Sequence, residues 1–159
     1  MPINNRGFGG AHISDMLHYY QETVKEYTPR IIVFYCGDND IAAGKPVLQV
    51  PADYIEFITK IKADLPGVRL IYLPVKTSIS RWDKWPEMEQ LNQRIKQFNA
   101  TDSYLFFADT ATPMLKNGEK PGQDLFLDDG LHLNQTGYAL WASVLTPIIH
   151  KVYNESIKR

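Results

Sequence analysis

Apolar and polar positions along the chain follow two different periods, and together they predict helices that alternate with buried strands. Over residues 11–28 the apolar side chains recur at intervals of three and four, which is typical of an amphipathic helix that ends before Pro29. Ile31 to Cys36 is a continuous apolar run rich in β-branched and aromatic residues, and it predicts a buried strand. Residues 37–51, with Gly, Pro and Asp, predict a loop.

The same alternation continues to the end of the chain. It predicts a helix over residues 51–65, a strand over 69–73, a loop over 77–86, a helix from Pro86 to about Asn99, a strand over 104–108, a long loop over 109–135 and a last helix from about Thr136. Pro147 should kink or interrupt this last helix. Helices that alternate with strands imply a parallel sheet covered on its faces, with ligands beyond the carboxyl ends of the strands.

The bulk composition fits one domain over residues 1–159, with 44% apolar residues to form its core. The charge is nearly balanced, with 17 basic and 18 acidic residues, so nothing attracts the chain to nucleic acid. The single cysteine, Cys36, excludes an internal disulfide. No stretch approaches the roughly 18 consecutive apolar residues of a membrane span. If Met1 is the natural start, a cytoplasmic protein is expected, whereas a longer natural N-terminus leaves room for a signal peptide.

A glycine-rich segment, residues 5–10 (NRGFGG), opens the first predicted helix. Glycines at a helix start let the backbone approach a ligand, and the free N–H groups there favour negative charge. The alternative is a tight turn that needs a positive φ angle. A dinucleotide-binding fingerprint is excluded, because the spacing differs and no strand of useful length precedes the segment.

A polar segment, residues 37–40 (GDND), directly follows the first predicted strand. The amide of Asn39 is a neutral donor that can face a developing oxyanion. A simple turn is the alternative, since these residue types favour turns. A calcium loop is a further option, but the remaining ligands of such a loop are missing, so we expect no metal here.

A third segment, residues 129–132 (DGLH), precedes the last helix. A carboxylate three residues before a histidine can fold back onto Nδ1 through a turn, which leaves Nε2 free to act as a general base. The predicted pair is therefore Asp129 and His132. The alternative is a loop histidine that is merely exposed or hydrogen-bonded.

In their order along the chain, these three segments resemble the SGNH (GDSL-type) ester hydrolases, whose blocks are a serine motif, a glycine, an asparagine in Gly-x-Asn-Asp and an Asp-x-x-His pair. The resemblance implies a three-layer α/β/α, flavodoxin-like fold and hydrolysis of acyl or carbohydrate acetyl esters without a cofactor. It implies that Asp129 and His132 are triad partners and that Gly10 and Asn39 supply oxyanion donors.

The chain departs from this family at the serine block, because it contains no Gly-Asp-Ser motif. We therefore expect that the N-terminus is incomplete, that the sheet lacks its first one or two strands, and that activity is weak or absent. The alternative function is a non-catalytic remnant that acts as a binding or assembly module. A metal-dependent hydrolase using Asp38, Asp40 and His132 is a more distant third.

Two further predictions concern the surface. Arg81, Trp82 and Phe126 are placed at the rim of a pocket for a small ester substrate, although the aromatic residues could instead simply anchor their own loops. If the first strands are missing, the run Ile31–Cys36 becomes an open apolar edge, and such an edge can pair with a second copy to form a homodimer.

Overall fold

A computed structural model describes residues 2–157. Three strands in this part of the chain form a parallel sheet. The strands β1 (Ile31–Phe34), β2 (Arg69–Tyr72) and β3 (Leu105–Phe107) lie in the order β1-β2-β3. Ile31 pairs with Arg69, and Leu70 pairs with Leu105. Met1, Lys158 and Arg159, assigned to the same domain by the sequence, lie outside the described residues.

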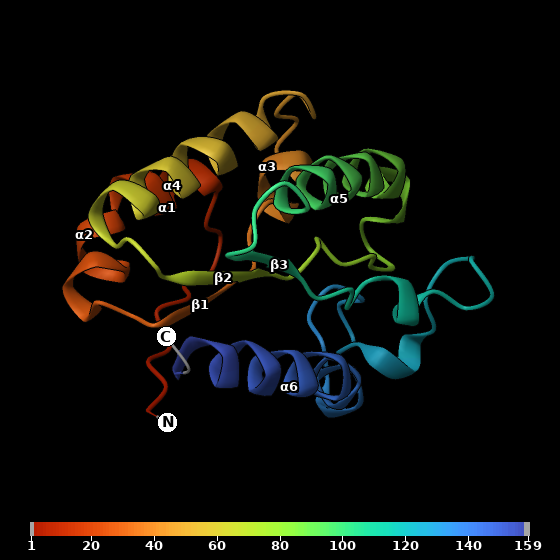
Figure 1. Cartoon of the computed structure of the whole chain (residues 1–159). Coiled ribbons are helices and arrows are strands. Elements are labelled where there is room, and N and C mark those ends of the chain that lie inside the picture. Colours follow the sequence, from red (N-terminus) through yellow and green to blue (C-terminus); the bar gives the residue numbers. More distant parts are fainter. Residues whose placement is uncertain (1, 158–159) are drawn as a thin grey trace.

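Helices cover both faces of this sheet. They are α1 (Ile13–His18), α2 (Tyr20–Thr23), α3 (Asp38–Ala42), α4 (Val50–Asp64), α5 (Trp85–Asn99) and α6 (Gln135–Ile157), with short 3-10 turns at 25–27, 82–84, 112–114 and 123–125. Figure 1 shows α1 to α5 on one face and α6 on the other. The three-layer α/β/α class predicted from the sequence is thus confirmed.

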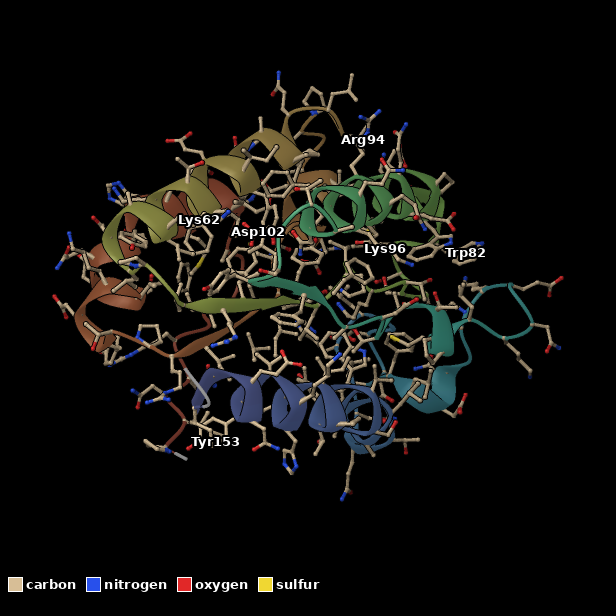
Figure 2. The ribbon with its side chains drawn as sticks, in the orientation of Figure 1. Lys62, Trp82, Arg94, Lys96, Asp102 and Tyr153 are labelled. Atoms are coloured by element: carbon tan, nitrogen blue, oxygen red, sulfur yellow. The ribbon has the colours of Figure 1, made fainter. Side chains whose placement is uncertain are left out.

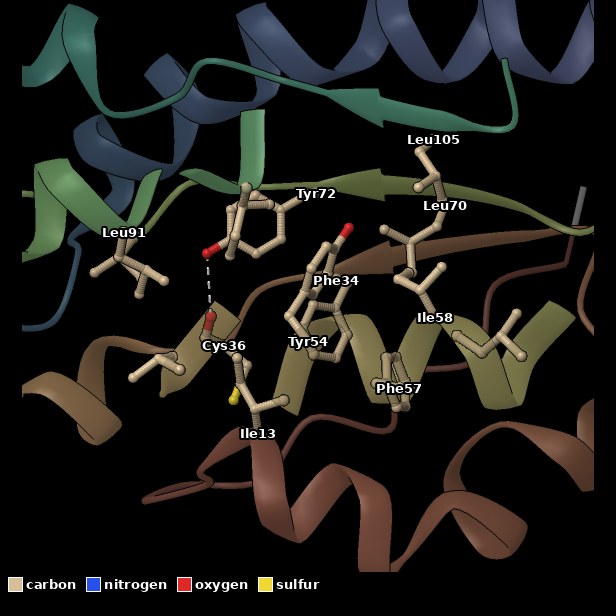
Figure 3. Packing of buried hydrophobic residues seen from close by; sticks show 14 of the residues in the cluster. Ile13, Phe34, Cys36, Tyr54, Phe57, Ile58, Leu70, Tyr72, Leu91 and Leu105 are labelled. Carbon is tan, nitrogen blue, oxygen red and sulfur yellow. Dashed lines mark hydrogen bonds between the residues drawn. The ribbon is translucent and has the colours of Figure 1, made fainter. Parts of the chain in front are cut away.

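The larger core lies between the sheet and the helices α1, α4 and α5. Alternate strand residues point to this side, and Phe34 and Tyr72 bring their rings against Tyr54 of α4. Figure 3 shows these rings together with Phe57, whose ring centroid lies 4.7 Å from that of Phe34. The buried hydroxyl of Tyr54 donates to Asn99 Oδ1 at 3.0 Å, so burial leaves it paired.

The opposite face of the sheet rests on α6. Ile71, Leu73 and Ala108 form a second core with Val152 of that helix. The predicted interruption at Pro147 is wrong: α6 runs through it to Ile157, because packing against the sheet holds the helix despite a lost backbone hydrogen bond. None of the described helices is long and apolar enough to cross a membrane.

The single helix predicted over residues 11–28 is wrong. The segment breaks at Tyr19 and again at Val24, and it forms α1, α2 and a 3-10 turn. Both Tyr20 and Val24 are buried in the main core. Packing of these side chains therefore overrides a periodicity that a straight helix would also satisfy.

The structure also corrects the segment that follows the first strand. β1 ends at Phe34 rather than Cys36, since its ladder with β2 spans only four residues. The predicted loop over residues 37–51 contains α3, a helix too short to leave a periodic signal. Its first turn carries Asp38 and Asp40, whose charges suit a helix N-terminus.

β1 is an edge strand within the described part of the chain. It pairs with β2 on one side only, and its other side has no partner strand among residues 2–157. Phe34 is buried by the helices above it, but Val33 on the opposite face remains 43% exposed. The open apolar edge expected from the sequence is therefore narrower than the whole run to Cys36.

Gly37 generates the first prediction, because it turns the chain from β1 into α3 with a φ of 125°. A Cβ at this position would lie 3.2 Å from Leu91 Cδ2 and 3.2 Å from Val75 Cγ2. Gly37→Ala should therefore lower the free energy of unfolding by about 2–5 kcal/mol, the sum of backbone strain and overpacking. Gly44→Ala is the matched control, with φ 83° and open space around the added Cβ. Equal losses for both variants in denaturant unfolding would contradict the packing argument.

Candidate active site

Parallel strands bring three loops to the same edge of the sheet. The chain leaves β1 toward α3, leaves β2 through residues 73–81, and leaves β3 through residues 109–134. Of the residues that the sequence singles out after a strand, those at 38–40 lie in the first turn of α3, and Arg81, Asp129 and His132 lie in the loops after β2 and β3. This is the edge at which ligands bind in open α/β sheets.

Asp129 and His132 form the pair that their spacing predicts. Oδ2 of Asp129 lies 2.6 Å from Nδ1 of His132, while Oδ1 accepts the backbone N–H groups of Leu131 and His132 at 2.8 and 2.9 Å. A carboxylate on Nδ1 sets the imidazole tautomer and leaves Nε2 as the unprotonated position. The histidine side chain is 69% exposed, so Nε2 is open to a reactant.

The loop that carries this pair is held from two directions. Gly130 adopts φ 62°, and its carbonyl accepts the N–H groups of Ile79 and Ser80 from the loop after β2. On the other side, Leu127 N–H donates to the carbonyl of His132 at 2.8 Å. The Asp–His loop is therefore fixed to the neighbouring loop through its backbone.

Asn39 lies in the first turn of α3, and both ends of its amide are engaged. Nδ2 donates to the carbonyl of Ala11 at 3.1 Å. Oδ1 accepts from both terminal nitrogens of Arg81, each at 3.2 Å. The amide thus joins the glycine-rich segment to the loop after β2, and the second hydrogen on Nδ2 remains for another acceptor.

The two carboxylates beside Asn39 are buried and paired with different elements. Asp38 Oδ2 accepts from Tyr35 Oη at 3.1 Å, Arg81 at 3.3 Å and Lys76 Nζ at 3.4 Å. Asp40, with a fully buried side chain, accepts the N–H of Ile13 at 3.1 Å. These two groups therefore form ion pairs and hydrogen bonds within the fold.

Lys76 is a buried cation at this edge. Burial lowers the pKa of its ammonium below the ordinary value, and the carboxylates of Asp38 and Asp129 oppose part of that change. The pKa of the Tyr35 phenol is raised, because the group is buried and because the charge of Asp38 adds to the effect. The sequence pattern did not single out either residue; a lysine shortly after the end of a buried strand was the available signal.

Gly10 lies at the surface, in a turn with φ 76°. The positive φ expected for a tight turn is present, and a Cβ there would meet nothing within 4 Å. Cys36 and Asn39 both donate to the carbonyl of the next residue, Ala11, so this turn lies directly beside the amide of Asn39. The role of Gly10 as an oxyanion donor stays a prediction.

The predicted rim residues lie in different environments. Phe126 is buried against Met114 and Leu133, beneath the Asp–His loop. The rings of Trp82 and Trp85 are parallel with centroids 6.4 Å apart, and Figure 2 shows Trp82 on the outside of the molecule beside α5. Arg81 points its guanidinium at Asn39 and Asp38.

Within residues 2–157, no hydroxyl or thiol forms a hydrogen bond with His132. Ser78 is buried and its hydroxyl has no partner, while Ser14 lies on α1. Burial raises the pKa of the Cys36 thiol, so it stays protonated at neutral pH. The same described residues contain no group of three or more His, Cys, Asp or Glu side chains that could hold a metal ion.

A parallel α/β sheet with an oriented Asp–His pair beyond its strand ends is typical of hydrolytic enzymes. The comparison with family models makes this specific. The GDSL-like lipase/acylhydrolase family matches residues 1–140, and the chain belongs to this family. Ester hydrolysis is the chemistry of that family.

Solved structures with the same fold agree with this assignment. A GDSL-like lipase from Bacteroides thetaiotaomicron aligns with a TM-score of 0.79 at 21% identity, covering 92% of this chain and 74% of that one. A carbohydrate esterase family 3 protein from Talaromyces cellulolyticus aligns with a TM-score of 0.76 at 20% identity, covering 97% and 78%. A serine-to-alanine mutant of an acetyl esterase, solved with an acetate ion, aligns with a TM-score of 0.78 at 21% identity, covering 93% and 71%. No curated protein sequence matches the chain.

The Asp–His contact generates a prediction about titration. The hydrogen bond from His132, followed by the two backbone N–H groups, lowers the pKa of Asp129 to about 2. His132→Ala should raise this pKa part of the way toward the ordinary value near 3.8, because the backbone donors remain. Since the folded pKa is the lower one, the contribution to stability is present at pH values above the ordinary pKa and is lost as pH falls toward 2. Carbon-detected NMR titration measures the pKa of Asp129 in the native chain and in His132→Ala. An unchanged midpoint in the variant would refute the hydrogen bond from His132 as the main cause of the lowered pKa.

Proposed function

We propose that this chain hydrolyses small acyl esters with His132 as the general base, and that it does so weakly because it lacks the serine of its family. The observation that carries the proposal is the 2.6 Å contact between Asp129 Oδ2 and His132 Nδ1. Because Asp129 engages Nδ1, the Nε2 atom of this exposed side chain is left free. It lies at the same edge of the sheet as the Asn39 amide. The donors proposed for the oxyanion are the Asn39 amide and the Gly10 N–H.

The proposed reaction uses water as the nucleophile. Nε2 of His132 takes a proton as the water oxygen bonds to the ester carbonyl carbon, and the carbonyl oxygen becomes an oxyanion held by Asn39 and Gly10. The intermediate then collapses, the carbon–alkoxide bond breaks, and the departing alkoxide recovers the proton from His132. The products are a carboxylic acid and an alcohol. Sites that lack a triad member retain about 10³–10⁴-fold catalysis over water.

An acetyl group is the acyl group that we propose. Two neighbours of the same fold are described as an acetyl esterase and an acetylxylan esterase, so short acyl groups on small alcohols or sugars are the first substrates to test. Rim roles for Arg81 and Trp82 belong to the same proposal, whereas Phe126 is buried and can act only by packing beneath the Asp–His loop. Trp82 is the best placed of the three to meet an alcohol or sugar portion, because it lies on the outside of the molecule.

A non-catalytic binding module is the second candidate, and one observation favours it. No hydroxyl among residues 2–157 is paired with His132, so the described site contains a base without a nucleophile. Such a site could still bind a carboxylate through His132 and the Asn39 amide. The serine-to-alanine neighbour with an acetate ion gives the ligand to test.

Hydrolysis of p-nitrophenyl acetate separates the two candidates. We expect slow turnover that His132→Ala lowers by about 10²–10⁴-fold, the usual contribution of a general base, while the control His150→Ala, which removes an exposed histidine from α6, leaves the rate unchanged. Intact mass after a fluorophosphonate probe should show no adduct if water is the nucleophile. A rate that His132→Ala leaves unchanged would refute the proposal, and acetate binding without any turnover would establish the binding module instead.

We also propose that the open edge of β1 associates with a second copy of the chain. The unpaired backbone of the strand and the 43% exposed Val33 support this, since such edges template further pairing.

Light scattering after size exclusion tests the association over a range of concentrations. We expect dimers for the native chain and monomers for Val33→Lys, because a charged side chain on an edge strand blocks pairing. Ile55→Lys, at a 39% exposed position on α4, is the matched control and should remain dimeric. A native chain that is monomeric at every concentration would refute the proposal.

A further inference from the structure

Arg81 differs from an ordinary rim residue because its guanidinium faces inward. Both terminal nitrogens lie 3.2 Å from Oδ1 of Asn39, and one of them also lies 3.3 Å from Oδ2 of Asp38. The side chain is only 22% exposed. A substrate at the rim would thus meet an arginine whose terminal nitrogens are already engaged with protein acceptors.

These contacts determine which way the amide of Asn39 points. Arg81 can only donate and the carbonyl of Ala11 can only accept, so Oδ1 must face the arginine and Nδ2 must face Ala11. Rotation of the amide by half a turn would place an NH₂ group against a cation and an oxygen against a carbonyl. One hydrogen of Nδ2 is used by Ala11, and the other is left with a defined direction.

Arg81 is itself held in place by the fold. Asp38 fixes the guanidinium, and the same carboxylate is anchored by Tyr35 and the buried Lys76. The neighbouring residues Ile79 and Ser80 donate their N–H groups to the carbonyl of Gly130, within the Asp–His loop. One short segment therefore contacts both halves of the site.

We propose that Arg81 is a positioning residue: it orients the Asn39 amide toward the oxyanion, and its loop holds that amide in register with His132. The inference rests on the proposed function, because an oriented donor matters only if an oxyanion or a carboxylate binds there. Arg81 acts through Asn39 and does not contact the reacting atoms.

The orientation can be measured without turnover, by ¹⁵N relaxation of the Asn39 side-chain amide, whose signals are assigned through their loss in Asn39→Ala. In Arg81→Met the order parameter of this amide should fall and its contact with Ala11 should weaken. Arg81→Lys should give an intermediate result, since a single ammonium cannot supply the two-pronged contact. The control Arg94→Met removes an arginine that Figure 2 shows on the outer side of α5, and it should change nothing.

The kinetic arm uses a double-mutant cycle on p-nitrophenyl acetate hydrolysis. Arg81→Met should lower kcat roughly 10- to 100-fold with little change in KM, less than the 10²–10³ lost with a whole oxyanion donor. In the Asn39→Ala background the same substitution should have no further effect, because Arg81 acts through that amide. Thermal unfolding of each variant confirms that it is folded.

The two arms separate failure of this inference from failure of the proposed function. A native chain without turnover refutes the hydrolase, yet the relaxation arm still decides the role of Arg81. An Asn39 amide that is equally ordered in Arg81→Met and Arg94→Met overturns the positioning role. So does a cycle in which the effects of Arg81→Met and Asn39→Ala simply multiply.

Discussion

Two buried carboxylates in the first turn of α3 are the constraint on which the site depends. Asp40 binds the start of α1, and Asp38 binds the loop after β2, so each must find its partner in a different part of the chain. Removing one partner from a buried ion pair typically costs about 3–5 kcal/mol. The fold is therefore held at the point where Asn39, between them, is placed.

From this anchor the site extends through backbone contacts. The loop after β2 is fixed to α5 by Asn92, whose amide bonds both the N–H and the carbonyl of Val75. The N–H groups of Ile79 and Ser80 in the same loop then donate to the carbonyl of Gly130, which lies in the loop that carries the Asp–His pair. The Asn39 amide and the Asp–His pair thus belong to one connected structure, whereas β1 has no second partner strand within residues 2–157 and the side chain of His132 is largely exposed.

A feature could be predicted from the sequence where all the residues that form it lie in one short segment. Asp129 and His132 lie in one turn, so their contact followed from spacing alone. The three strands were visible as apolar runs, and their parallel order followed from the helices between them. By contrast, the break at Tyr19 and the continuity of α6 through Pro147 depend on packing against distant residues, which no local period records.

The sequence by itself determined the fold class, the edge of the sheet where the candidate site residues gather, and the contact between Asp129 and His132, because hydrophobic period and short-range turns are local properties. Only the tertiary structure decided what Arg81, Lys76 and Tyr35 do. The contacts of Lys76 with Tyr35 and Asp38, and of Arg81 with Asn39, join the ends of two strands that pair in space but lie some forty residues apart in the chain. Charges so distant in sequence become partners only when the sheet forms, since burial then leaves them no water to pair with.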